Sequence, residues 1–143
     1  MGQIYSLTSD EAEEIMAAAI QTLKTQFKVA SVVIVNRDGT EIAKSVMDGV
    51  RLFTTNVACM KAKQAAWIGK PTSVTRDQLS EGEITPAILG IAIERIVPWA
   101  GGVPIYDEEG HLLGGIGVSN LTQEDDEAVA GNAIGKVGFK EHA

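Results

Sequence analysis

Six glycines fall within the twenty residues from Gly101 to Asn120, and the rest of that segment has the pattern of a buried β-hairpin with an acidic turn at Asp107–Gly110. Glycine weakens a strand, because it loses more backbone freedom on folding than other residues and has no side chain to pack. So many glycines in one hairpin predict that something approaches its backbone closely. A ligand, a neighbouring subunit and a crossing helix would each explain them. The six positions are Gly101, Gly102, Gly110, Gly114, Gly115 and Gly117.

The residues before this hairpin predict a helix and then a first hairpin. A capping box at Thr8 and apolar residues at helical spacing indicate a helix over residues 9–27. The β-branched run Val29–Val35 is typical of a strand buried on both faces. The Asp38-Gly39 turn leads from this run into a partner strand over residues 41–46.

Further helices are predicted on either side of the glycine-rich hairpin. Apolar residues share one helical face over Thr55–Ile68, which predicts a middle helix. The polar stretch 72–83 has the composition of a loop, and Thr85-Pro86 predicts a short helix near residues 86–91. Thr122 caps a final helix with an acidic first turn. Helices combined with antiparallel hairpins indicate an α+β fold, in which helices pack on an antiparallel sheet.

Charge and cysteine content narrow the class of protein. A net charge of −7 disfavours nucleic-acid binding, which depends on clustered Lys and Arg. The single cysteine, Cys59, excludes an internal disulfide and a thiolate metal cage, and suits a reducing cytoplasm. The N-terminus lacks the pattern of a secretory signal, and no apolar run reaches the roughly 18 residues of a membrane span. We therefore expect a cytoplasmic protein of one domain, residues 1–143, that binds neither nucleic acid nor membrane.

The chain shows no constellation typical of an enzyme. Ser119, Thr72 and Cys59 are the candidate nucleophiles, but neither histidine has an evident route to act as their base. His111 follows the acidic turn, an arrangement more typical of a solvated hairpin tip than of a metal site. The sequence thus favours a binding protein, with no catalytic or metal-ligating residue assigned. A lyase or hydrolase using Ser119 or Asp126 is the minor alternative.

Several short motifs occur in a characteristic order. The most specific is the Gly-Gly-Val-Pro-Ile segment Gly101–Ile105, followed by Gly114–Ser119 and an acidic helix start at Glu124–Glu127. Earlier in the chain stand Met47-Asp48-Gly49, Lys61-Ala62, Ala65-Ala66 and Pro71-Thr72. In this order the motifs resemble the GlcG/HbpS-like family, often labelled haem-degrading, which includes the C-terminal domain of PduO-type corrinoid adenosyltransferases. The resemblance implies a profilin-like fold, a homo-oligomer and, for some members, binding of haem or a related tetrapyrrole.

Two departures from the family pattern bear on the ligand. The family commonly has a Ser-Gly-Gly-Thr turn where this chain has Ser119-Asn120-Leu121-Thr122. Haem iron is usually held by His, Cys, Met or Tyr, and histidine occurs only at His111, in the second hairpin, and at His142, next to the last residue. Neither is expected on a helix that faces a pocket. The other candidate ligands, each more typical of packing, are Met47, Met60, Tyr5 and Tyr106.

The residues and the resemblance together lead us to expect a small cytoplasmic, homo-oligomeric accessory or binding protein. The cofactor is left open by the residues, and the resemblance implies haem or a related tetrapyrrole such as cobalamin. The expected pocket lies between the middle helix, the Met47-Asp48-Gly49 turn and the Gly101-Gly102 edge, with Lys61 meeting an anionic group such as a propionate or phosphate. The alternative is a ligand-free assembly or partner-binding subunit serving a corrinoid-dependent enzyme. Trp67 and Trp99 flank these regions and favour a subunit interface over the wall of a flat ligand. The candidate cofactor-binding residues are Met47, Asp48, Lys61, Gly101, Gly102 and Ser119.

Overall fold

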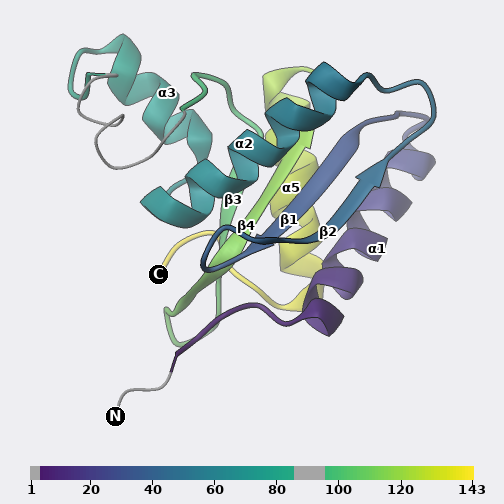
Figure 1. Ribbon diagram of the computed structural model, residues 1–143, viewed down its shortest axis with the longest axis horizontal. Coiled ribbons are helices and arrows are strands. Elements are labelled where there is room, and N and C mark those ends of the chain that lie inside the picture. The colour runs from purple at the N-terminus through teal and green to yellow at the C-terminus, as the bar shows by residue number, and fades with distance from the viewer. Residues whose placement is uncertain (1–3, 86–95) are drawn as a thin grey trace.

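The protein folds around one antiparallel sheet. The computed structural model describes residues 4–85 and 96–143 (Figure 1). The strands β1 (Ser31–Asn36), β2 (Glu41–Val46), β3 (Gly102–Tyr106) and β4 (Leu112–Ser119) lie in the order β2-β1-β4-β3, and each neighbouring pair is antiparallel. The described helices are α1 (Ser9–Thr25), α2 (Leu52–Ile68), α3 (Thr72–Ser80) and α5 (Gln123–Val137). The predicted α+β class is confirmed.

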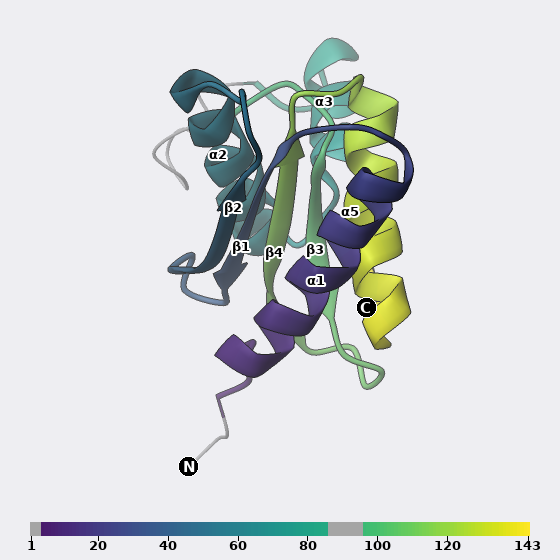
Figure 2. The same ribbon diagram turned by 90° about the vertical axis from the view of Figure 1, so that its right-hand side faces the viewer.

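Helices cover both faces of the sheet. Figure 2 shows α2 on one face and α1 with α5 on the other. Alternate residues of a strand point to opposite faces, so β1 serves both layers. Val33 and Val35 pack with the α2 alanines Ala58, Ala62 and Ala66, whereas the neighbouring strand residues join the larger core under α1 and α5. The unbroken apolar run of β1 is buried on both faces, as predicted.

Two of the three glycines of β4 lie against α2, whereas Gly114 lies against the β1 backbone at Val35. A Cβ atom placed on Gly117 would overlap the Ala58 carbonyl oxygen, and one on Gly115 would overlap the Ala62 carbonyl oxygen. Gly102 of β3 faces the backbone carbonyl of Lys61 in the same way. Of the three explanations for a close approach to this hairpin, the structure supplies the crossing helix.

The prediction of a loop over residues 72–83 is wrong, because residues Thr72–Ser80 form α3. Polar residues misled the prediction, since Thr72 and Thr75 are buried rather than solvated. The Thr72 hydroxyl accepts a hydrogen bond of 3.0 Å from the Gly102 backbone N–H, which fixes the start of α3 against β3. The short helix predicted near residues 86–91 lies outside the described residues.

Candidate functional site

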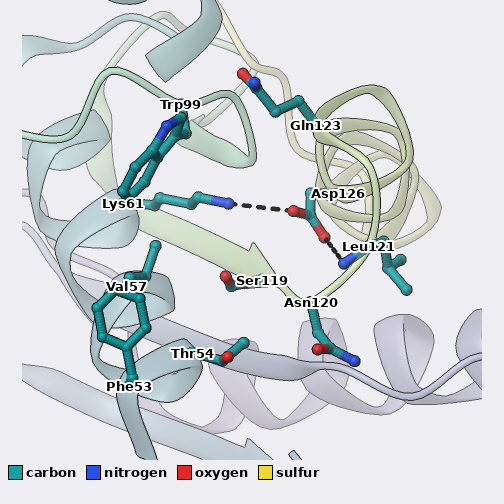
Figure 3. A pocket seen from close by; sticks show the side chains of 10 residues that line it. All are labelled: Phe53, Thr54, Val57, Lys61, Trp99, Ser119, Asn120, Leu121, Gln123 and Asp126. Carbon is teal, nitrogen blue, oxygen red and sulfur yellow. Dashed lines mark hydrogen bonds and ion pairs between the residues drawn. The ribbon is translucent and has the colours of Figure 1, made fainter. Parts of the chain in front are cut away.

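A pocket of about 260 Å³ opens where the first half of α2 faces the start of α5 (Figure 3). Three segments line it: α2, the chain just before β3, and the connection from β4 into α5. One wall is apolar and aromatic, and the floor is polar. The lining residues are Phe53, Thr54, Val57, Lys61, Trp99, Ser119, Asn120, Leu121, Gln123 and Asp126.

The floor is built around an ion pair between Lys61 of α2 and Asp126 of α5. The Lys61 ammonium lies 3.1 Å from Asp126 Oδ2 and donates a second hydrogen bond of 3.0 Å to the Val118 carbonyl. Both charged side chains are only 3% exposed. A Cβ atom on Gly101 would lie 2.7 Å from Lys61 Nζ and 2.9 Å from the Asp126 Cβ. Glycine at position 101 therefore leaves the space that the pair occupies.

The first turn of α5 holds Asp126 in place. The Thr122 side chain caps the helix by accepting from the Asp125 N–H, and Asp126 Oδ1 accepts a 3.1 Å hydrogen bond from the Leu121 N–H. Burial raises the pKa of the Asp126 carboxyl above its usual value, although Lys61 opposes this shift. Burial likewise lowers the pKa of the Lys61 ammonium, against the attraction of Asp126. The pair is held in a poorly solvated environment that penalises both charges.

Several polar groups of the pocket retain hydrogen-bonding capacity. A lysine ammonium has three N–H donors, and protein groups accept from two of those of Lys61. In Figure 3 the Ser119 hydroxyl points into the space between Val57 and the ion pair. Figure 3 shows Trp99 on the same side of the pocket as Val57 and Phe53. A planar apolar group with a polar edge matches this arrangement.

The rim is tied together by Gln123, the first residue of α5. Its Oε1 accepts 2.9 Å hydrogen bonds from Arg76 Nη1 of α3 and from the Ala100 N–H. The segment before β3, which carries Trp99, is thereby fixed to α5 and α3. The helix that the sequence did not predict thus supports one side of the pocket.

The structure brings together four of the six predicted cofactor-binding residues. Lys61 and Ser119 line the pocket, and Gly101 and Gly102 lie against Lys61. Met47 instead packs against the core on the α1 side of the sheet, and Asp48 is exposed in the turn before α2. Neither belongs to the lining of this pocket.

Asp126 is a site residue that the sequence did not identify as a binding residue. The acidic first turn of α5 is explained by its helix dipole, and only Asp126 among those acidic residues is buried. Its position three and four residues before the buried Val129 and Ala130 puts it on the inner face of α5. The helical spacing that buries Asp126 was therefore present in the sequence, but only the position of Lys61 identifies Asp126 as part of the site.

Other candidate groups have structural partners. His111 Nδ1 lies 2.8 Å from Asp107 Oδ2, and the ring stacks on Tyr5 with a centroid distance of 3.6 Å. Two backbone N–H groups, of Glu109 and His111, donate to Asp107 Oδ1, and the His111 bond is the main cause that lowers the pKa of this carboxyl. Burial raises the pKa of the Cys59 thiol, so this cysteine is a weak nucleophile.

The two tryptophans occupy different environments. The Trp67 indole packs against Gly39 in the β1–β2 turn and donates a long hydrogen bond of 3.4 Å to the Asp38 carbonyl. Trp67 thus packs against a turn within its own chain. Trp99 lines the pocket and is 41% exposed. Of the two, only Trp99 is placed to meet a ligand bound in this pocket.

Comparison with known proteins places this chain in a family. A family model described as haem-degrading protein HbpS-like matches residues 7–135. The chain therefore belongs to the HbpS-like family. Within residues 4–85 and 96–143, no helix is both long enough and apolar enough to cross a membrane.

Individual relatives agree with this assignment. The chain is 25% identical to the corrinoid adenosyltransferase PduO of Citrobacter freundii over 96% of its own length, but it spans only 41% of that enzyme. The crystal structure of the PduOC:haem complex superposes with a TM-score of 0.85 at 25% identity, covering 96% of this chain and 99% of the other. A double mutant of HbpS from Streptomyces reticuli gives a TM-score of 0.83 at 26% identity, with 96% and 91% covered.

Proposed function

We propose that this chain is a homo-oligomeric accessory protein that binds haem or a related tetrapyrrole, and that it carries this ligand rather than transforming it. Membership of the HbpS-like family and the similarity to a PduOC domain crystallised with haem support the ligand class. The observation that carries the proposal for this chain is the pocket itself, which combines an aromatic wall with a buried Lys61–Asp126 floor. The proposed location is the cytoplasm.

The proposed ligand enters the pocket with one edge. Pockets that enclose drug-sized ligands measure roughly 300–1,000 Å³, whereas this one measures about 260 Å³. A tetrapyrrole would insert an edge beside Ser119 and Lys61 and lay its remaining surface across Phe53 and Trp99. Met47 and Asp48 do not line this pocket, so the proposed contacts to the ligand are those of Lys61, Ser119 and the aromatic wall.

Among the described residues that line the pocket there is none of the side chains that usually bind haem iron, namely His, Cys, Met and Tyr. In this proposal the protein therefore holds the macrocycle through its periphery. Iron-free protoporphyrin is expected to bind within about threefold of haem, because metal ligation contributes little. A loss of more than about a hundredfold for the iron-free porphyrin would instead indicate an iron ligand elsewhere on the chain.

A spectroscopic titration with haem and with cobalamin, run alongside light scattering, tests the proposal. Saturable binding at micromolar concentration to a well-folded oligomer is expected, and Trp99→Ala is expected to weaken it about tenfold by removing the aromatic wall. Trp67→Ala is the matched control, because Trp67 is absent from the pocket lining. Flat titrations with both ligands would contradict tetrapyrrole binding.

A ligand-free assembly or partner-binding role is the second candidate. It is favoured by the match to part of a corrinoid adenosyltransferase, because this chain corresponds in length to 41% of that protein. In this role the chain would form a stable complex with a corrinoid-dependent enzyme and bind no tetrapyrrole. Co-purification with such an enzyme, together with flat haem and cobalamin titrations, would support it.

A further inference from the structure

Lys61 lines the pocket and has hydrogen-bonding capacity left over. It donates to Asp126 Oδ2 at 3.1 Å and to the Val118 carbonyl at 3.0 Å, so one of its three N–H groups has no acceptor among the described residues. The Ser119 hydroxyl lies in the same lining. These donors suit an oxygen acceptor on a ligand, and a charged acceptor forms the stronger hydrogen bond with an ammonium.

A ligand carboxylate would nevertheless meet an unfavourable charge balance. The Lys61 ammonium is already neutralised by Asp126, and both side chains are 3% exposed. A second carboxylate at the same ammonium would leave one uncompensated negative charge in a poorly solvated site, which is costly. Two carboxylates that share a site resolve this by retaining one proton between them.

We infer that this pocket recognises a carboxylate on its ligand and takes up one proton at Asp126 as that carboxylate binds. The inference rests on the proposed function, because the tetrapyrrole would enter with its carboxylate-bearing edge. A protonated Asp126 keeps one oxygen as acceptor for the Leu121 N–H. Its other oxygen gains an O–H donor for the incoming carboxylate, while Lys61 remains the shared cation.

Asp126 is the group placed to take the proton. Asp125, on the same helix, is paired with Lys28 at 3.0 Å and is half exposed. Arg76 of α3 contacts Gln123 and Asp77. Among the described ionisable side chains that line the pocket, Lys61 and Asp126 are the only two. Burial already shifts the pKa of the Asp126 carboxyl upward, which is the direction that favours protonation.

The pH dependence has a definite sign. The complex holds one more proton than the free protein plus ligand, so affinity is highest in the acidic part of the range and falls as pH rises. Between the Asp126 pKa of the free protein and that of the complex, affinity falls up to about tenfold for each pH unit. An esterified ligand brings no charge and is expected to show neither the proton uptake nor this pH dependence.

The test compares haem with haem dimethyl ester on the full chain by titration calorimetry, in buffers of different ionisation enthalpy, from about pH 6 to about pH 8.5. We expect uptake of about one proton with haem, none with the ester, and affinity for the ester lower by about tenfold to a hundredfold. Asp126→Asn keeps an acceptor oxygen for the Leu121 N–H and offers an N–H donor where the protonated carboxyl would offer its O–H, but it cannot ionise. It is expected to bind haem with an affinity that no longer changes with pH.

Two lysine variants complete the experiment. Lys61→Met is expected to lose the preference for haem over its ester. Lys70→Met, at an exposed lysine just after the end of α2, is expected to keep it. Haem and ester binding equally, without proton uptake, would overturn the inference and leave tetrapyrrole binding intact. Failure of both porphyrins to bind the wild-type protein would overturn the proposed function and the inference with it. The wild-type comparison of the two porphyrins needs no variant to fold.

Discussion

At the scale of single residues, the buried ion pair couples the stability of the fold to the pocket. Lys61 and Asp126 come from helices on opposite faces of the sheet and meet at the end of β4, beside the Val118 carbonyl. A buried pair of this kind adds little net stability when complete, because desolvation offsets the attraction. Removal of one partner is costly, since the other charge stays buried.

Lys61→Met is therefore expected to lower the free energy of unfolding by about 3–5 kcal/mol, because Asp126 loses its cation. The double variant Lys61→Met/Asp126→Leu is expected to recover most of this loss, because no buried charge remains. Urea unfolding monitored by circular dichroism measures both. Equal destabilisation of the single and double variants would show that the packing of Lys61, and not its charge, matters at this position.

Asn120 carries backbone strain at the rim of the pocket. Its φ of 124° is a conformation that side chains other than glycine rarely adopt. The side chain offsets part of the cost by donating a 2.9 Å hydrogen bond to the Val29 carbonyl. Strain at a residue that lines a pocket is typical of a functional position.

Asn120→Gly is expected to raise the free energy of unfolding by about 1 kcal/mol, because relief of strain exceeds the lost hydrogen bond. Asn120→Ala is the matched control: it loses the same bond, keeps the strain and is expected to destabilise the fold by about 1 kcal/mol. Thermal unfolding of the two variants side by side checks the prediction. An alanine variant as stable as the glycine variant would contradict it.

At the scale of elements, the contact between α2 and β4 depends on small residues on both sides. Alanines of α2 face glycines of β4, so that the helix backbone approaches the strand backbone. This approach is also what draws the Lys61 side chain into the interior. Gly135 of α5 is different, because a Cβ there would meet nothing within 4 Å.

Gly117→Ala is expected to lower the free energy of unfolding by about 1–3 kcal/mol, because the added methyl would overlap the Ala58 carbonyl and force α2 away. Gly135→Ala, the same substitution in open space on α5, is expected to stabilise the protein by about 0.5–1 kcal/mol through helix propensity. Urea denaturation measures both. Similar effects of the two substitutions would contradict the role of α2 as the element that requires glycine in β4.

At the scale of the whole molecule, exposed apolar side chains gather at the start of α2. Leu52 is 74% exposed and Phe53 is 69% exposed, and Phe53 also belongs to the pocket lining. Large apolar residues that neighbour one another on a surface are typical of an interface. In the proposed homo-oligomer, a second copy would cover Leu52 and so stand close to the mouth of the pocket.

Light scattering of the purified protein is therefore expected to give the mass of two or more chains, each of 15.1 kDa. The variant Leu52→Ser/Phe53→Ser is expected to shift this mass toward that of one chain while keeping the far-ultraviolet circular dichroism. Val74→Ser, at another exposed apolar residue on α3, serves as the control and is expected to keep the oligomer. A wild-type mass of one chain at micromolar concentration would contradict the proposed homo-oligomer.

Local patterns in the sequence were sufficient to predict most of the fold. The capping box at Thr8, the β-branched run of β1 and the cap at Thr122 each act within a few residues, so they predict the elements they belong to. The same reasoning failed for α3, because Thr72 and Thr75 of that helix are buried, and a polar composition does not distinguish a buried polar helix from a loop.

The sequence by itself determined the α+β class, the two hairpins and the need for close approach at the glycine-rich hairpin, because these depend on the spacing of apolar residues and on the backbone freedom of glycine. Only the tertiary structure decided that α2 makes this approach and that Lys61 meets Asp126, which lies 65 residues further along the chain. The physical reason is that a contact between distant segments forms only when helices and strands pack together. The spacing of residues indicates which face of its own helix or strand a side chain occupies, and not which other segment packs against that face.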